Sequence, residues 1–203
     1  MPKNLKDVRA GDGAHFMPVA LEHASRLINH GPTVLVTSGH RTACNVMAAA
    51  WSMPVEFTPP RIAVVIDKKT YTRELVMASG AFGLCLPGAA LTGVTYAVGN
   101  VTGRAQDKFK QHNLRMHRSP VLGVPMLQED CAAWLECRLI REPHTEDAYD
   151  TCFAEVVSAA ADDRIFRHGH WCFDNSNADL QTIHHLGGGN FVRSAGMFRG
   201  DFS

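Results

Sequence analysis

Short apolar and β-branched runs, each bounded by glycine, proline or polar turns, limit the possible folds of this chain more than any other feature. Strands are expected over residues 33–37, 43–51, 61–66, 82–86, 133–140 and 151–159. Regular strand–helix alternation is missing, and no G-x-G-x-x-G follows a strand, which argues against a dinucleotide-binding α/β fold. Many short strands bury one another most simply in a closed barrel, so the sequence predicts a mainly β fold with short helices.

Three short helices are expected between these strands. Residues 19–29 carry apolar side chains on one face at helical spacing, at Ala20, Leu21, Ala24, Leu27 and Ile28. Thr72 is expected to cap a helix over residues 73–79, which Gly80 ends. Residues 89–98 form the third candidate. We interpret residues 1–17 as a polar N-terminal arm and residues 18–203 as one domain.

Charge and composition narrow the classes of partner. Lys plus Arg and Asp plus Glu are equal at 20 each, so no global field attracts nucleic acid or an anionic membrane. The polar N-terminus has no apolar run typical of a secretory signal, and no segment approaches the roughly 18 apolar residues of a membrane span. None of the six cysteines forms a C-x-x-C pair. We therefore expect a cytoplasmic protein with free thiols that binds neither nucleic acid nor a membrane.

The run from Asn45 to Ser52 is the first candidate binding segment. Its small residues let a planar group approach the backbone, Asn45 adds an amide, and Trp51 adds an aromatic face. Taken alone, a core strand with one buried tryptophan explains the run better, because apolar core is the base expectation.

A second candidate is the polar turn from Asp67 to Arg73. Its cations and hydroxyls gather where a helix is expected to begin, and a helix N-terminus directs free N–H groups at an anion such as phosphate. An ordinary capped turn is the commoner alternative. Lys108, in the Asp107-Lys108-Phe109 segment, can complete a phosphate clamp.

The order of these motifs, with Pro59-Pro60 before a strand, resembles the flavin reductase-like family with the FMN-binding split β-barrel fold, and in particular its flavoredoxin-like branch. Residues 131–137 resemble the central strand of that family, and residues 184–191 resemble its last motif. The resemblance spans roughly residues 18–192 and implies FMN bound near the interface of a homodimer.

The resemblance also implies a set of FMN-binding residues. The residues expected beside the isoalloxazine and ribityl chain are Asn45, Val46, Met47, Ala48 and Trp51. Those expected near the ribityl and phosphate groups are Lys68, Lys69, Tyr71 and Thr72, with Lys108 reaching the phosphate and Phe191 closing over the flavin. The chain departs from the family at Tyr149-Asp150, where many members carry a histidine.

Two redox functions fit this resemblance. One is an NAD(P)H-dependent flavin reductase, in which NADH or NADPH gives a hydride to the flavin and a small-molecule or protein partner takes the electrons. FMN carries that chemistry, so no catalytic residue is assigned to the chain. The other is a flavoredoxin-like electron carrier that takes its electrons from a protein. No motif separates the two.

A third alternative is a split-barrel module without redox turnover that holds haem or another ligand, for which His168, His170, His184 and His185 are candidate ligands. His168, His170 and Cys172 share one face if they lie on a single strand. A fourth ligand is not evident, so no metal site is expected. Glu136 and Glu155 are expected to be outward strand residues or dimer contacts, because general acid/base work would need a defined partner.

Overall fold

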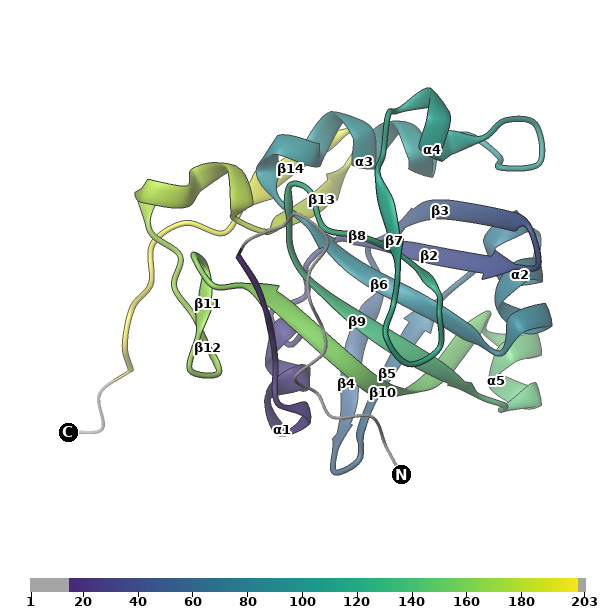
Figure 1. Ribbon diagram of the computed structural model, residues 1–203, viewed down its shortest axis with the longest axis horizontal. Helices are drawn as coiled ribbons and strands as arrows, with labels where there is room; N and C mark the ends of the chain where they lie inside the picture. The colour runs from purple at the N-terminus through teal and green to yellow at the C-terminus, as the bar shows by residue number, and fades with distance from the viewer. Residues whose placement is uncertain (1–14, 201–203) are drawn as a thin grey trace.

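The computed structural model describes residues 15–200, and its centre is one antiparallel sheet (Figure 1). The strand order is β3 (Ala43–Ala49), β2 (Val34–His40), β6 (Ala81–Pro87), β9 (Cys131–Ile140), β10 (Thr151–Asp162), β5 (Pro60–Val65) and β4 (Ser52–Phe57). A short strand, β1 (Phe16–Pro18), pairs with the end of β10. The expected strands are therefore present, and β3 and β4 lie at the two ends of the strand order.

The sheet curls around an apolar interior, so strands far apart in the strand order share one core. Val36 of β2, Ile62 of β5 and Leu135 of β9 belong to the same cluster of buried side chains. Ala24, Leu27 and Ile28, from the N-terminal helical segment, pack into this cluster as well. A curled sheet with a filled interior is the barrel that the strand pattern predicts.

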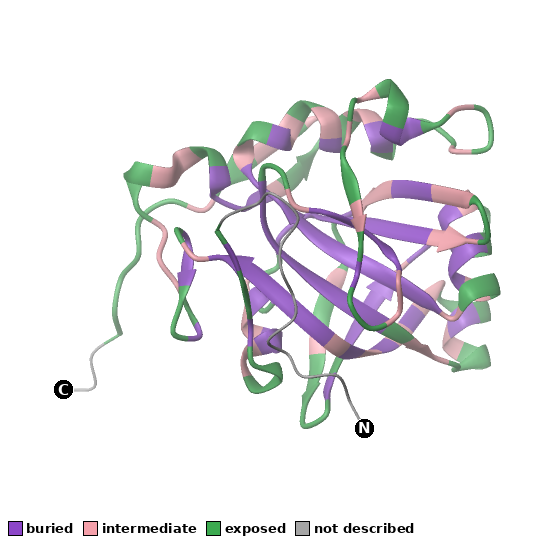
Figure 2. Cartoon of the chain, viewed as in Figure 1, coloured by how far each residue is buried: buried purple, intermediate pink, exposed green. Residues whose placement is uncertain are grey.

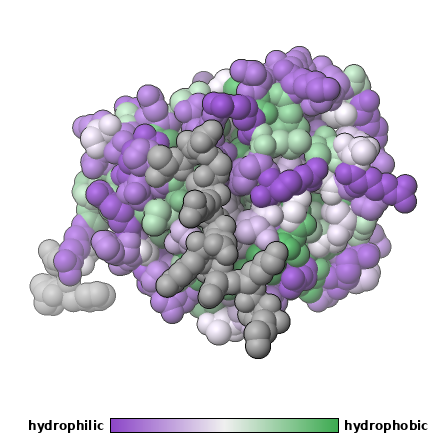
Figure 3. All heavy atoms as spheres, viewed as in Figure 1, coloured by the Kyte–Doolittle hydropathy of each residue, from purple (hydrophilic) through white to green (hydrophobic). Residues whose placement is uncertain are grey.

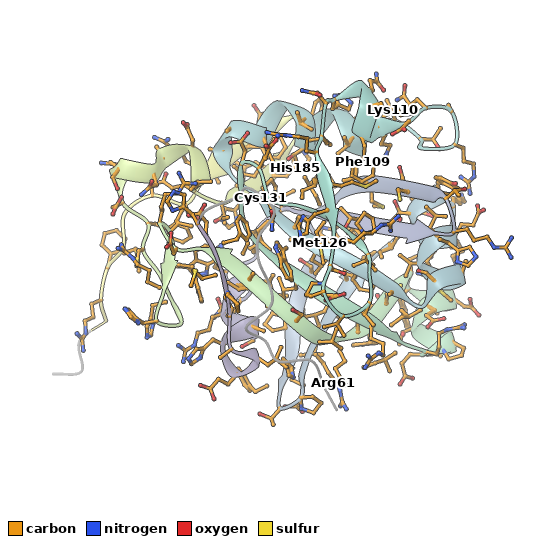
Figure 4. The ribbon with its side chains drawn as sticks, in the orientation of Figure 1. Arg61, Phe109, Lys110, Met126, Cys131 and His185 are labelled. Carbon is orange, nitrogen blue, oxygen red and sulfur yellow. The ribbon has the colours of Figure 1, made fainter. Side chains whose placement is uncertain are left out.

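A second apolar cluster covers the outer face of the same strands. Leu35, Cys85 and Trp134 alternate with inward residues of β2, β6 and β9 and pack against Phe109 and Met126. The covering elements are α3 (Thr92–Gly99), α4 (Lys108–Gln111), β7 (Met116–Arg118) and β8 (Pro125–Leu127). Figures 2 and 4 show this layer: the strands beneath it are buried, and Phe109 and Met126 lie at its inner side. The central strands are therefore buried on both faces.

Glu136 lies on the outer face of β9, but this face is covered, so the residue does not reach the surface as an outward strand residue or a dimer contact would. The Glu136 side chain is fully buried under the segment that connects β7 to β8. Its carboxylate accepts hydrogen bonds from the Ser119 hydroxyl and from the backbone N–H groups of Val121 and Leu122. A buried carboxylate requires such donors, so Glu136 anchors the covering segment to the sheet.

The helices begin or end at other residues than the sequence predicts. Residues 19–29 form only a short helix, α1 (Leu21–Ala24), followed by a 3₁₀ turn, η2 (Ser25–Leu27). Helix α2 (Tyr71–Ser79) begins two residues earlier than expected, because Thr70 rather than Thr72 caps it and accepts a hydrogen bond from Arg73 N at 3.2 Å. Gly80 ends α2 at φ 70°, as expected. Residues 89–98 form a 3₁₀ turn, η3 (Ala89–Leu91), that leads into α3.

Some elements lie outside the expected pattern. Strand β2 runs on to His40, and β3 ends at Ala49 rather than at Trp51. Strand β4, which contains Pro54, and helix α5 (Pro143–Ala148), which begins at a proline, were not expected.

The chain after the sheet forms two hairpins joined by a 3₁₀ segment, η4 (Asn175–Leu180). The first hairpin pairs β11 (Phe166–Arg167) with β12 (His170–Trp171), and the second pairs β13 (Ile183–Gly187) with β14 (Asn190–Arg193). His168 lies in the turn of the first hairpin at φ 52°. The premise that His168, His170 and Cys172 share one strand is therefore wrong.

A chain of side-chain hydrogen bonds holds the β13–β14 hairpin against the N-terminal segment. His30 Nε2 lies 2.9 Å from Thr182 Oγ1, which lies 2.9 Å from Ser194 Oγ. Ser194 Oγ lies 3.1 Å from His184 Nε2, and His184 Nδ1 lies 2.9 Å from the Gly31 carbonyl. Burial, followed by the nearby His184, lowers the pKa of His30 to about 4. His30, which helps to dock the hairpin, is therefore neutral near pH 7.

We predict that this docking makes folding stability fall in mildly acid solution. The pKa of His30 is about 4 in the folded chain and ordinary in the unfolded one, so the unfolded state binds a proton first as the pH falls. The contribution of neutral His30 is complete above about pH 6.5 and is lost toward pH 4, at a cost of up to about 3 kcal/mol. Denaturant unfolding at a series of pH values measures this slope. A His30→Gln variant, which keeps a donor for Thr182 but does not titrate, should show a shallower slope; equal slopes would contradict the assignment.

Candidate functional site

The predicted binding residues of β3 meet the start of α2 through one buried side-chain contact. Asn45 and Thr72 are both buried, and Asn45 Nδ2 donates to Thr72 Oγ1 over 2.8 Å. Strand β3 is the last strand of the sheet order, so β2 is its only ladder partner among the described strands. The contact therefore fixes the end of the sheet to the helix whose N-terminus was predicted to face a phosphate.

The loop between α3 and α4 closes tightly over this contact. A Cβ atom at Gly103 would lie 2.1 Å from Asn45 Oδ1, a distance that any other residue could reach only by displacing the Asn45 amide. A Cβ at Gly99 would lie 3.3 Å from the Ala48 side chain. Glycine at position 103 lets the loop backbone come close to the Asn45 amide.

Lys108 ties the same strand to the helices that cover it. Its buried ammonium donates to the Val46 carbonyl at 2.9 Å and to the Val98 carbonyl at 2.7 Å. Burial lowers the pKa of Lys108 to about 8. Its charge is therefore held beneath β3, between the strand and α3.

Arg104 joins the α3–α4 loop to the start of α2. Its guanidinium lies over the Tyr71 ring at 5.5 Å, donates to the Lys69 carbonyl at 3.1 Å and pairs with Glu74 at 2.9 Å. The ammonium of Lys69 has no hydrogen-bond or ion-pair partner within the described part of the chain. Lys69 is thus a free cation beside the first turn of α2.

Lys68, Trp51 and Phe191 lie apart from this junction. The Lys68 ammonium turns toward α5, where it donates to the Asp147 carbonyl and lies 3.6 Å from Asp150. Trp51 is 74% exposed at the start of β4. Phe191 of β14 packs on His185 with ring centroids 4.9 Å apart, at the side of α3 where Figure 4 shows His185. Among the described residues, neither aromatic side chain has a hydrogen bond or ring contact with Asn45 or Thr72.

Met47 and Ala48 complete the predicted run without a polar contact of their own. Met47 packs against the interior cluster, whereas Val46 and Ala48 face the outer one. Around them, several buried hydroxyls have no hydrogen-bond partner in the described structure, including those of Thr37, Ser38 and Ser52. Ser38 lies directly across from Asn45 on β2, and Ser52 follows Trp51. An unpaired buried hydroxyl is costly, so each of these can take a polar ligand atom or a water as its partner.

Sequence reasoning missed Gly103 and Arg104, although both lie just before the Asp107-Lys108-Phe109 motif. A glycine followed by an arginine in a polar loop is a usable signal for close backbone approach beside a cation. The sequence does not indicate which residues they contact; in the structure Gly103 lies against Asn45 and Arg104 lies over Tyr71.

Residues 15–200 contain neither a membrane-spanning helix nor a cluster of metal-binding side chains. No helix in that range has the length and apolar character needed to cross a membrane. In the same range, no group of three or more His, Cys, Asp and Glu side chains is arranged to hold a metal ion.

Comparison with known proteins identifies a family. The family model described as flavin reductase like domain matches residues 26–175. The uncharacterized protein YddH of Escherichia coli (strain K12) is 54% identical over 183 residues, which cover 89% of this chain and 96% of YddH.

Solved structures agree with that match. An FMN-binding domain of a flavin reductases-like enzyme from Shewanella baltica OS155 superposes with a TM-score of 0.88 at 39% identity, covering 92% of this chain and 97% of the other. The flavoredoxin of Desulfovibrio vulgaris (Miyazaki F) shares the fold, with a TM-score of 0.73 at 22% identity and coverage of 100% and 98%. The curled sheet is thus the split β-barrel that the sequence predicts, and the chain belongs to the flavin reductase-like family.

Proposed function

We propose that this chain binds FMN where β3 meets α2 and transfers electrons through it as an NAD(P)H-dependent flavin reductase. The observation that carries the proposal is the Asn45–Thr72 junction, which has an unpartnered Ser38 hydroxyl beside it and the free Lys69 cation at the adjoining helix start. The similarity to the FMN-binding domain from Shewanella baltica supports the same cofactor.

The residues present fit a flavin phosphate and a planar ring. Lys69 and the first N–H groups of α2 offer positive charge to a phosphate. Ser38 and Asn45 share one face of β2 and β3, where a hydroxyl and an amide suit the polar edge of a heteroaromatic ring. Trp51, which follows the far end of β3, offers an exposed aromatic face. The Lys108 ammonium stabilises β3 by donating a hydrogen bond to the Val46 carbonyl.

FMN, when bound, supplies the hydride and electron chemistry. The work left to the chain is to bind and orient the cofactor and to exclude water from it. Arg104 and Gly103 hold the α3–α4 loop against α2 and β3, which keeps the proposed binding surface in one shape. No side chain of the junction is assigned a proton-transfer role.

We further propose a homodimer in which β4 forms the interface. Four large apolar side chains occupy every second position from the residue before β4 to its last residue. Their exposed fractions are 74% for Trp51, 58% for Met53, 41% for Val55 and 71% for Phe57. On the face viewed in Figure 3, hydrophobic side chains form separate patches among hydrophilic ones. A continuous apolar row on a sheet edge favours binding of a partner, and Trp51 would bring that partner next to the flavin.

We also propose that the protein works in the cytoplasm, because its six free cysteines suit a reducing compartment.

The first test is the visible spectrum of the purified protein with FMN under anaerobic conditions. We expect a bound-flavin spectrum that bleaches on addition of NADH or NADPH. A bound flavin that neither nucleotide reduces would replace the reductase with an electron carrier of the flavoredoxin kind. Protein that takes up no FMN at micromolar concentrations would overturn both.

A second prediction concerns Trp51. Trp51→Ala should weaken FMN binding about tenfold or more, because an aromatic contact and its buried area are lost. Flavin fluorescence titration measures the change. Phe198→Ala is the matched control, since Phe198 is 97% exposed and lies far along the chain from the junction. Equal loss in both variants would remove Trp51 from the site.

A third prediction concerns the β4 row. Phe57→Glu should convert a dimer to a monomer, because it places a charge in the proposed apolar interface, while the exposed position spares the fold of the single chain. Light scattering after size-exclusion chromatography measures the mass. Tyr149→Glu, at another exposed aromatic, should leave the mass unchanged. A wild-type monomer at high concentration would contradict the interface.

A further inference from the structure

A cavity of about 390 Å³ lies beside the proposed flavin site, between α2, α5 and the α3–α4 loop. Four cationic side chains line it, from three separate segments: Lys68, Arg73, Arg104 and Arg141. Three carboxylates also line it, so the lining carries one more positive than negative charge. Figure 1 shows α2 and α5 next to each other at one end of the barrel.

The wall of this cavity includes a buried charge without an ion-pair partner. Arg73 is 5% exposed, and its guanidinium donates only to backbone carbonyls, those of Ile66 at 3.0 Å, Asp150 at 3.3 Å and Glu146 at 3.0 Å. Within residues 15–200 no carboxylate lies in ion-pair range of Arg73. Coulombic attraction to Arg73 already favours the charged form of Glu146 in the same lining, and an anion in the cavity would add a further negative charge near the buried guanidinium.

The carboxylates of the lining are already engaged with other groups. Glu146, which is buried, accepts from Arg141 Nε at 3.1 Å and from the Glu142 N–H at 2.9 Å. Glu74 pairs with Arg104. Because Arg141 uses only its Nε, its two terminal nitrogens have no partner within the described residues. Those nitrogens can form the paired N–H contacts that arginine makes with a phosphate.

The cavity faces away from the Asn45–Thr72 junction. Positions 73, 74 and 77 of α2 line it, and they lie 100° to 200° around the helix from Thr72 at about 100° per residue. The two places nevertheless adjoin, because Lys68 lines the cavity and Arg104 stacks on Tyr71. A ligand that reaches the flavin from this side would pass its far end over the cavity.

We propose that this cavity binds a phosphate monoester, the 2′-phosphate of NADPH, and so makes NADPH rather than NADH the preferred donor. The inference rests on the proposed reductase function for its biological meaning. FMN carries the same chemical group, and the position of the cavity on the far face of α2 favours the nucleotide as its source.

The first test measures nucleotide binding to the wild-type protein, which requires no catalytic turnover. Adenosine 2′,5′-bisphosphate and adenosine 5′-monophosphate, titrated calorimetrically, should differ in affinity by about tenfold or more, the scale of one or two charge-assisted hydrogen bonds. Equal affinities would overturn the proposal, whether or not the protein oxidises either nucleotide. A clear preference together with no oxidation of NADPH would support the cavity and reject the reductase function.

Two variants locate the phosphate. Arg141→Gln removes one ligand, and Met77→Glu adds a repelling charge to the lining while keeping both Arg141 and Glu146 in the chain. Each should abolish the preference for the bisphosphate and raise the KM for NADPH about tenfold or more while leaving that for NADH unchanged. Arg61→Gln is the matched control, because Arg61 is exposed on β5 and does not line the cavity (Figure 4).

A flavin comparison separates the two sources of phosphate. In both cavity variants the affinities for FMN and for riboflavin should match those of the wild type. A selective loss of FMN affinity, with riboflavin binding kept, would assign the cavity to the flavin phosphate and overturn the nucleotide assignment. Circular dichroism and thermal unfolding verify that each variant is folded before its affinity is interpreted.

Discussion

Burial of the central strands on both faces is the constraint on which the rest of this structure depends. Strands β2, β6 and β9 place one set of side chains in the barrel interior and the other set, including Leu35, Cys85 and Trp134, on the outside. Left uncovered, the outer set would be a large apolar surface, which soluble proteins rarely expose. Helices α3 and α4 and the β7–β8 segment cover it, and this cover carries Lys108 and Arg104 to β3 and α2. The candidate site is therefore a product of how the outer core is closed.

The sequence predicts most of the fold because strand propensity is local. The runs around Val34, Ile62 and Leu84 are short, apolar and rich in β-branched residues, and each forms the expected strand. Strand β4 escaped prediction because Pro54 and Glu56 break its pattern, and its apolar residues turn outward instead of into the core. The burial of Glu136 escaped as well, since its donors come from residues 119–122 and nothing near Glu136 in sequence indicates them.

In the candidate site, too, the region was predictable from local sequence, whereas contacts with distant residues were not. Motif order and resemblance predict that Asn45, Thr72 and Lys108 belong to one region, and the structure places all three around β3. Their individual contacts were not predictable, because each depends on a partner at a distance along the chain: Thr72 for Asn45, the carbonyls of Val46 and Val98 for Lys108, and α5 for Lys68. The cavity beside α2 was also beyond sequence reasoning, since its cations come from three segments that only the fold unites.

The hydrogen bonds that dock the C-terminal hairpin also have fixed donor and acceptor roles. The Gly31 carbonyl can only accept, so His184 carries its proton on Nδ1, and the neutral ring must accept at Nε2. Ser194 then donates to His184, Thr182 donates to Ser194, and His30 donates to Thr182 from Nε2. This order selects a single tautomer for each ring and leaves the buried Nδ1 of His30 unprotonated. Because the direction of each hydrogen bond fixes the next, reversing one of them would require both hydroxyls in the row to rotate and both rings to exchange tautomers.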